Sequence, residues 1–434
     1  MYFFIGIKGT GMASLAIMLH DLGHEVYGSD LSKHFFTQDN LEKRNIKILD
    51  FNKNNIVDNL TIIIGNAFNE DFEEVIAARN NPTCKVYRYH EFVGELMNNY
   101  TSFSVCGSHG KTTTTGMLSS MLSNNFNTGY LIGDGTGVID NSSELFVLES
   151  CEYRRHFLSY HPDYAIITNI EIDHVDYFKN DQDYLEAYIE FADNVKKAIF
   201  VFGDDAKTRE FKSDKKHYFY GINDNNDLVC KNLTEYSDHM EFDIYFLKEY
   251  IGHFDIPFVG RHMLFNSLGC IGIGILMNMT CKEIQSGLKD FKGVKRRYII
   301  SEYKNNIYID DYAHHPTEVA VTIEATKKRY PDREIVAIFK PHRVGRVYYF
   351  KDQFAEALSL ADHVYLCDFT SIDDKEDGID IDVSYLKNSI NNAYVLTEDE
   401  DGAKLLSKYD NVVFLFMSSK DIYNLLELVK KQFE

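Results

Sequence analysis

The sequence lacks the features that mark secreted, zinc-binding and membrane-spanning proteins. Its seven cysteines include no CxxC pair, so neither a disulfide framework nor a zinc site is indicated. It has no apolar run of the roughly 18 residues that a membrane-spanning helix needs, and no basic region precedes a long apolar segment at its start. We therefore expect a soluble protein of the reducing cytoplasm with no membrane partner.

Positive charge is also scarce, because 45 Lys and Arg face 66 Asp and Glu and give a formal net charge of −21. Binding to a nucleic-acid backbone depends on Lys and Arg, so we expect no nucleic-acid partner. Small anions are not excluded, since backbone amides and a few local cations can bind them. The 434 residues, 44% of them hydrophobic, suffice for two or three domains with separate cores.

The periodicity of the chain predicts three α/β domains. In the first, residues 2–5 read as a strand, and apolar residues from Met12 to Leu22 follow at helical spacing until Gly23. A second strand begins at Val26, which completes a βαβ unit, and further strands are expected at 61–64 and 86–87. We assign residues 1–97 to this Rossmann-like domain.

The other two domains are assigned to residues 98–293 and 294–434. In the central one, strands are expected at 103–105, 145–148 and 164–167, and the polar segment 207–232 is expected to form loops. In the last one, strands at 307–309, 335–339, 364–367, 394–396 and 412–417 alternate with helical patterns. That alternation predicts a second Rossmann-like, doubly wound domain.

The first glycine-rich turn reads GIKGTG, and Lys8 stands where the dinucleotide fingerprint G-x-G-x-x-G has its second glycine. Glycines between a strand and a helix still leave amides free for an anion. Asp30 lies near the end of the second strand, where an acid could reach a ribose hydroxyl. The turn is read either as a ligand-free connection or as a site for a nucleotide other than NAD.

The motif GSHGKTTTT at 107–115 is typical of a phosphate-binding loop, although it is shorter than G-x-x-x-x-G-K-[ST]. Lys111 would bind the β- and γ-phosphates, and the Thr112 hydroxyl would be a magnesium ligand. Glu152 and His174 each follow an expected strand, at the sheet edge where ligands gather in open α/β proteins. Singly, each would be read as a solvated loop residue; behind a phosphate loop they become candidate metal ligands.

Three motifs of the last domain, GVKRRY, DDYAHHP and KPHRVGR, bring cations into an otherwise acidic chain. Cations at strand ends suit an anionic substrate or a phosphoryl group in transfer, although salt bridging to surface acids would also account for any single arginine. Pro316 is expected in the first turn of a helix, where it would fix the preceding loop.

These motifs, with CEYRRHF and TNIEIDHVDYF, occur in an order that resembles the Mur ligases across nearly the whole chain, and most of all the ligases acting on UDP-N-acetylmuramate and L-alanine. The short loop G-x-H-G-K-T is typical of that family. The resemblance implies a UDP-sugar-binding Rossmann-like domain, a central P-loop ATPase domain and a Rossmann-like amino-acid-binding domain, with ATP and Mg²⁺ as cofactors.

The resemblance also implies roles for particular residues. The UDP-sugar would be bound by Gly9, Thr10, Gly11, Met12, Ser29 and Asp30. ATP would be bound by Gly107, Ser108, His109, Gly110, Lys111, Thr112, Thr113, Asn266, Arg297 and Asp311. Magnesium would be held by Thr112, Glu152 and His174, and the catalytic set would be Lys111, Glu152, His174, Arg297, Asp311, His342, Arg343 and Arg346.

The implied reaction is formation of an acyl phosphate from the lactyl carboxylate and ATP, followed by attack of the L-alanine amino group, in cytoplasmic peptidoglycan precursor synthesis. We expect a monomer or a homodimer. The chain departs from the family pattern at Met263 in GRHMLFN, at FMSSKDI, at Lys340 and at Gly345. A ligase for another amino acid or a peptide, and a nucleotide-binding relative without ligase activity, are therefore alternatives.

Overall fold

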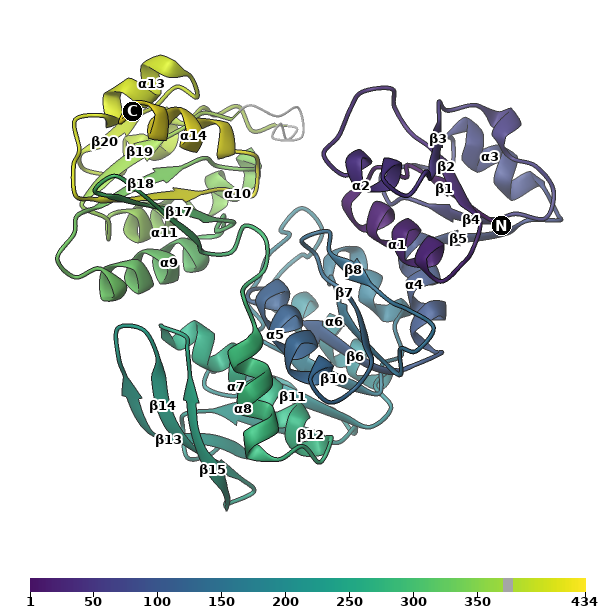
Figure 1. The fold of residues 1–434 in the computed structure, drawn as a ribbon, viewed down its shortest axis with the longest axis horizontal. Helices are drawn as coiled ribbons and strands as arrows, with labels where there is room; N and C mark the ends of the chain where they lie inside the picture. Colours follow the sequence, from purple (N-terminus) through teal and green to yellow (C-terminus); the bar gives the residue numbers. More distant parts are fainter. Residues whose placement is uncertain (370–377) are drawn as a thin grey trace. The chain divides into compact units, whose positions relative to one another are not determined.

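The computed structural model describes residues 1–369 and 378–434. These residues form three sheets of five, ten and six strands (Figure 1). None of the helices in this described part is both long and apolar enough to cross a bilayer.

The first sheet is entirely parallel, with strand order β3-β2-β1-β4-β5. Its strands are β1 (Tyr2–Ile5), β2 (Val26–Ser29), β3 (Lys47–Leu49), β4 (Thr61–Ile64) and β5 (Lys85–Arg88). Its helices are α1 (Thr10–Asp21), α2 (Gln38–Glu42), α3 (Glu73–Asn80) and α4 (Tyr89–Met97). The predicted strands 2–5 and 61–64 match β1 and β4, and α1 stops before Gly23 as expected, because the Gly23 amide caps the His20 carbonyl at 2.8 Å.

The second sheet has the order β15-β14-β13-β12-β11-β10-β6-β9-β7-β8. Its strands are β6 (Thr101–Cys106), β7 (Thr128–Leu131), β8 (Gly137–Val138), β9 (Leu145–Glu149), β10 (Tyr164–Ile167), β11 (Ala198–Phe202), β12 (His217–Gly221), β13 (Leu228–Glu235), β14 (Met240–Phe246) and β15 (Glu249–Ile256). The accompanying helices are α5 (Lys111–Ser123), α6 (Asp181–Asp193), α7 (Arg261–Leu276) and α8 (Cys281–Asp290).

The expectation of loops over 207–232 is wrong, because β12 and the start of β13 lie within it. In β12, half-buried and buried residues alternate along HYFYG. This strand pairs in parallel with the buried β11, and the polar residues on either side of its short aromatic run conceal it in the sequence.

The third sheet has the order β16-β17-β21-β18-β19-β20, and within it only the β16–β17 pair is antiparallel among the described strands. Its strands are β16 (Ile299–Tyr303), β17 (Asn306–Asp311), β18 (Ile335–Phe339), β19 (His363–Leu366), β20 (Ala393–Val395) and β21 (Val413–Met417). Its helices are α9 (Pro316–Arg329), α10 (Val344–Tyr349), α11 (Lys351–Leu358), α12 (Ser384–Lys387), α13 (Glu400–Leu406) and α14 (Tyr423–Lys431). Pro316 opens α9, as the sequence predicts.

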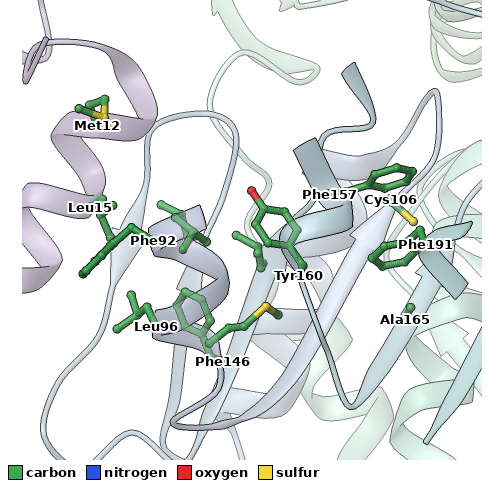
Figure 2. Packing of buried hydrophobic residues seen from close by; sticks show 14 of the residues in the cluster. Met12, Leu15, Phe92, Leu96, Cys106, Phe146, Phe157, Tyr160, Ala165 and Phe191 are labelled. Carbon is green, nitrogen blue, oxygen red and sulfur yellow. The ribbon is translucent and has the colours of Figure 1, made fainter. Parts of the chain in front are cut away.

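By packing, the chain divides into two compact units, one of residues 1–232, 242–254 and 265–292, the other of residues 233–241, 255–264 and 293–434. The boundaries 1–97, 98–293 and 294–434 stay predictions. Within the first unit, one buried cluster joins the first and second sheets. Figure 2 shows Leu15 of α1 with Phe92 and Leu96 of α4, in the same cluster as Phe146 and Tyr160.

Candidate active site

The loop between β6 and α5 places Lys111 at the first position of α5. Gly110, which caps this helix, has a φ of 80°, a left-handed conformation that glycine adopts without steric cost. A Cβ at Gly110 would lie 2.7 Å from Oδ1 of Asn266, so the loop also leaves no room for a side chain there. The N-terminus of α5 therefore has no side chain at Gly110, and its backbone amides can approach a phosphate closely.

The loop is held from the neighbouring strand end, just after β10. The Ser108 hydroxyl donates to the Glu171 carbonyl at 2.5 Å, and the His109 amide donates to Oδ1 of Asn169 at 2.9 Å. The Thr168 hydroxyl donates to the His109 carbonyl at 2.6 Å. Besides Ser108, the loop conformation is thus fixed by the side chains of Thr168 and Asn169, which the sequence analysis did not single out.

Lys111 folds back over this loop. Its Nζ donates to the carbonyls of Gly107 and Ser108 and lies 3.1 Å from Oε2 of Glu152, whose side chain is fully buried. Burial opposes the charged form of Lys111, but Glu152, Cys151 and Glu149 outweigh it and raise the pKa of the ammonium. Lys111 is therefore a permanent cation beside the loop.

Of the predicted metal-binding residues, His174 lies beside Glu152, whereas Thr112 is bonded to Glu149. His174 Nε2 is 3.5 Å from Oε1 of Glu152, and the Thr112 hydroxyl donates to Oε1 of Glu149 at 3.0 Å. Magnesium prefers oxygen donors, so the Thr112 hydroxyl and the Glu152 carboxylate suit that ion, whereas His174 offers a nitrogen. Thr113, the next residue of α5, is half-buried.

Glu149 and Tyr184 belong to this cluster but were missed by sequence reasoning. Glu149 is the last residue of β9, and its other carboxylate oxygen accepts from the Gly133 amide at 2.6 Å. The Tyr184 hydroxyl donates to Oε1 of Glu152 at 3.3 Å and lies 3.0 Å from Ser108 Oγ. Glu149 could have been found from the sequence, because it is an acid at the end of an apolar run. Tyr184 could not, because it is 32 residues from Glu152 in the sequence and belongs to no local motif.

The residues predicted to bind the UDP-sugar surround the β1–α1 turn. Gly9 precedes α1, and a Cβ at Gly11 would lie 2.7 Å from the Tyr89 hydroxyl. The side chains of Met12 and Ser29 are buried, and the Ser29 hydroxyl donates to Oε2 of the buried Glu74 at 2.5 Å. Thr10, Gly11 and Met12 can therefore offer backbone amides from the first turn of the helix, whereas Ser29 supports the fold of the strand end.

A cavity of about 310 Å³ lies between α4 and the turn η2 (Tyr153–Ser159), and it was not predicted from the sequence. Its lining includes Tyr89, His90, Arg154 and His156. The rings of His90 and His156 stack at 4.2 Å. Burial, with His90, Arg154 and Arg88 nearby, lowers the pKa of His156 to about 4, so Arg154 rather than the histidine pair supplies the charge at neutral pH.

Tyr89, which lines this cavity, also lies next to Gly11 of α1, and the cavity lining includes Cys151 and Tyr153, the sequence neighbours of Glu152. Arg154 has a φ of 52°. Non-glycine residues in that left-handed region are uncommon and gather at functional sites.

In the last sheet, two predicted site residues, Asp311 and Arg297, make specific contacts near β17. The Asp311 carboxylate accepts from the amides of Tyr298 and Ala313, each at 2.8 Å. Burial raises the pKa of Asp311 despite the Arg297 guanidinium. Arg297 lies 3.6 Å from Glu318 and over the Tyr312 ring at 4.7 Å.

The KPHRVGR and FMSSKDI segments meet at the carboxyl ends of β18 and β21. His342 Nδ1 is 2.8 Å from Ser419 Oγ. Burial, followed by the charges of Lys420, His314, Arg346 and Arg343, lowers the pKa of His342 to about 3. Arg343 and Arg346, which the sequence predicts to belong to the site, therefore lie near His342, and so does Lys420.

Arg296, next to the predicted Arg297, holds the FMSSKDI turn. Its guanidinium donates to the carbonyls of Ser418 at 2.8 Å and Lys420 at 2.6 Å. Lys340 is bonded to Oε2 of Glu398 at 2.7 Å and so supports the same sheet edge. Two of the four departures from the family pattern, the FMSSKDI turn and Lys340, are thus held in the domain by specific contacts.

The three sheets correspond to three domains of one family. Residues 2–101 match the Mur ligase family catalytic domain, residues 105–274 the Mur ligase middle domain, and residues 295–419 the Mur ligase glutamate ligase domain. This result confirms the predicted three-domain α/β architecture.

Solved structures share the fold over almost the entire chain. The UDP-N-acetylmuramate–alanine ligase of Thermotoga maritima has a TM-score of 0.81 and 24% identity, with 99% of this chain and 98% of that one covered. A murein peptide ligase of Psychrobacter arcticus gives 0.71 and 22%, with the same coverage. A pseudomurein peptide ligase type C of Methanothermus fervidus gives 0.66 and 18%, with 99% of each chain covered. With all three domains of the family present in order, the chain belongs to the Mur ligases, a family of ATP-dependent ligases.

Proposed function

We propose that this protein joins L-alanine to the lactyl carboxylate of UDP-N-acetylmuramate at the expense of ATP. The observation that carries the proposal is the Lys111–Glu152 pair over the phosphate loop, with Thr112, Glu149 and His174 beside it. A binding protein without activity would have no need to keep a buried carboxylate and a buried ammonium in this arrangement, because burying them costs desolvation energy.

A carboxylate is a poor acyl donor, so the γ-phosphoryl group of ATP must first be transferred to it. Lys111 stabilises the charge that develops on the transferred phosphoryl group. Thr112, Glu152 and His174 would hold magnesium, with Glu149 supporting Thr112, and the bound ion supplies Lewis-acid polarisation of the phosphoryl oxygens. The acyl phosphate is then attacked by the amino group, and inorganic phosphate leaves.

The diphosphate of the sugar nucleotide would lie at the β1–α1 turn, and its sugar would occupy the 310 Å³ cavity, which Tyr89 and Tyr153 help to line. Backbone amides of Gly9, Thr10, Gly11 and Met12 would bind the diphosphate. The cavity combines aromatic rings with Arg154, a lining that suits a sugar ring carrying an anionic group.

The amino acid and the phosphates would be held by the cations at the ends of β18 and β21. His342 is neutral at pH 7 and is oriented by Ser419. Arg343, Arg346 and Lys420 supply charge for a carboxylate or a phosphate. Arg297 and Asp311 would contribute to the nucleotide, as the family motif implies.

Another amino acid is a second candidate, because the Ser418–Lys420 turn replaces the small glycine-rich turn of the family pattern. Phosphate release from ATP, UDP-N-acetylmuramate and Mg²⁺, with each of twenty amino acids added singly, separates the candidates. Release that requires both the sugar nucleotide and L-alanine supports the proposal. Release stimulated by another amino acid would replace the acceptor. No release with any of them would overturn the assignment of a single amino acid as the acceptor and favour a peptide acceptor or a nucleotide-binding relative without ligase activity.

Two variants make that assay specific to the site. Lys111→Ala should abolish release, since it removes the cation from the loop. Lys207→Ala is a matched control, because Lys207 is an exposed lysine paired with Asp181 at 2.9 Å, and it should retain full activity.

A further inference from the structure

Arg296 lies in the segment that leads into β16, the first strand of the last sheet. It has a φ of 56°, a left-handed conformation that is uncommon for residues other than glycine and gathers at functional sites. Its Nη2 donates to the carbonyl of Ser418 at 2.8 Å and to that of Lys420 at 2.6 Å, and its Nη1 lies 3.5 Å from the carbonyl of Ser419. One side chain therefore holds the backbone of three consecutive residues in the turn after β21.

The guanidinium of Arg296 is itself held by the end of β17 and the loop that follows. Its Nε lies 3.7 Å from Oδ2 of Asp310 in β17, and its Cζ lies 5.3 Å from the centre of the Tyr312 ring. Carbonyl oxygens that face the same point repel one another, and a planar cation with several N–H donors relieves that repulsion. The end of β17 thus determines the position of Arg296, and Arg296 determines the path of the turn.

The side chains of the same turn extend to His342, in the loop after β18. The Ser419 hydroxyl is 2.8 Å from Nδ1 of His342. Burial and then the charge of Lys420 lower the pKa of His342, so the ammonium lies near the ring. Because Arg296 binds the carbonyls of the turn, the direction of the Ser419 and Lys420 side chains depends on the backbone that Arg296 fixes.

We propose that Arg296 is a positioning residue of the acceptor site, which fixes the Ser418–Lys420 turn so that its side chains face His342. The inference rests on the proposed function, which assigns the cations at the ends of β18 and β21 to the amino acid and the phosphates. It gives Arg296 a role separate from that of its neighbour Arg297, which is predicted to bind ATP. Arg296 acts on the acceptor through the turn.

The test compares three variants by phosphate release, with UDP-N-acetylmuramate, Mg²⁺, ATP and L-alanine as the reactants. Arg296→Gln removes the charge and the shared contact with the carbonyls. Arg296→Lys keeps a charge, but its compact ammonium does not reproduce the planar fork of donors. Arg333→Lys is the matched control, because the Arg333 guanidinium also donates to a backbone carbonyl, that of Asn305, which precedes the opposite end of β17.

Arg296→Gln should raise the KM for L-alanine about tenfold, the effect of losing hydrogen bonds from a charged group. It should change the KM for ATP by less than about twofold. Arg296→Lys should raise the KM for L-alanine about threefold, and Arg333→Lys should change neither constant. Arg296→Gln combined with Ser419→Ala should resemble Arg296→Gln alone, because both substitutions disturb the same contact with His342.

Nuclear magnetic resonance of the His342 ring measures the same contact without catalysis, with the ring signals assigned by comparison with His342→Asn. In Arg296→Gln the pKa of His342 should rise from about 3 toward the ordinary value of about 6.5, because a loosened turn reduces the burial of the ring and the nearby charge. Arg333→Lys should leave this pKa unchanged. Arg296→Lys is measured in the same way, so the test does not depend on the folding of Arg296→Gln.

An unchanged KM for L-alanine in both Arg296 variants, or equal increases in the KM for L-alanine and for ATP, would overturn the inference. A double variant that shows the product of the two single effects, or an unchanged pKa of His342, would overturn it as well. If the wild type releases no phosphate in response to L-alanine, the proposed function fails instead. The resonance measurement then decides the role of Arg296 separately.

Discussion

Lys111 Nζ and Glu152 Oε2 lie 3.1 Å apart, with the carboxylate fully buried and the ammonium largely so. The two groups stabilise each other's charged forms at the end of the phosphate loop. Removal of either group leaves the other one charged, buried and without its partner. Such a loss lowers the stability of the fold strongly, because the remaining charge is poorly solvated.

Glu152→Gln should therefore lower the free energy of unfolding by about 3 kcal/mol and abolish ligase turnover, because the shape is kept while the charge is lost. Urea denaturation and phosphate release measure the two effects. Glu190→Gln is the control: Glu190 is an exposed acid paired with Arg155 at 2.9 Å, and its loss should cost under about 1 kcal/mol. Equal effects of the two variants would contradict the role of the buried pair.

Gly110→Ala should weaken ATP binding by at least about tenfold, because the new methyl group meets Asn266 and the residue must keep a φ of 80°. Gly23→Ala separates the two causes, since Gly23 has a φ of 89° with nothing within 4 Å of a new Cβ. It should cost about 1–2 kcal/mol of stability for the left-handed backbone and leave ATP affinity unchanged. Calorimetric titration with ATP distinguishes steric exclusion from backbone strain.

His342 should make the protein less stable as the pH falls. Its pKa is about 3 in the fold, against about 6.5 in an unfolded chain, so the unfolded state takes up the proton first. The stabilisation is complete above about pH 6.5 and is lost progressively from there down to about pH 3. Allowing for its partial exposure, we expect a loss of about 1 kcal/mol between about pH 7 and 5.

Urea denaturation of the wild type and of His342→Asn at these two pH values measures that contribution as a difference. The asparagine keeps a polar partner for Ser419 and cannot be protonated. The pH dependence should therefore be shallower in the variant. An identical dependence in both proteins would show that His342 is not held neutral by its surroundings.

Ser419→Ala should raise the KM for the amino acid about fivefold, the loss expected for one hydrogen bond of about 1 kcal/mol. The hydroxyl lies 2.8 Å from His342 Nδ1 and orients the ring. The KM for ATP should not change. Initial rates at varied concentrations of amino acid and of ATP measure the two KM values separately. A parallel rise of the KM for the amino acid and the KM for ATP would assign Ser419 a general structural role.

Much of the fold could be predicted from short apolar runs bounded by glycine or polar residues. The predicted strands at 2–5, 61–64, 164–167 and 335–339 coincide with β1, β4, β10 and β18, since buried parallel strands are apolar along their whole length. The strand β12 was not predicted because its short run HYFYG lies between polar stretches of sequence, whereas in the fold it pairs with both β11 and β13.

The candidate site divides in the same way. Lys111 and Thr112 are part of a local motif, and Glu152 and His174 follow strands that end at the same sheet edge, so their proximity could be predicted. The roles of Ser29, Asp30 and Lys8 depend on side chains that turn toward the backbone of a neighbouring segment. The periodicity of a sequence does not indicate the direction of such a side chain.

The Tyr184 hydroxyl, bonded between Ser108 and Glu152, has a consequence for observation of the site in solution. The chain has no tryptophan, so its near-ultraviolet absorption is dominated by tyrosine. Tyr184 is fully buried, and its band shifts with the charge placed near its hydroxyl. Occupation of the phosphate loop should therefore appear directly in a tyrosine difference spectrum, without an attached dye, and Tyr184→Phe should remove that change.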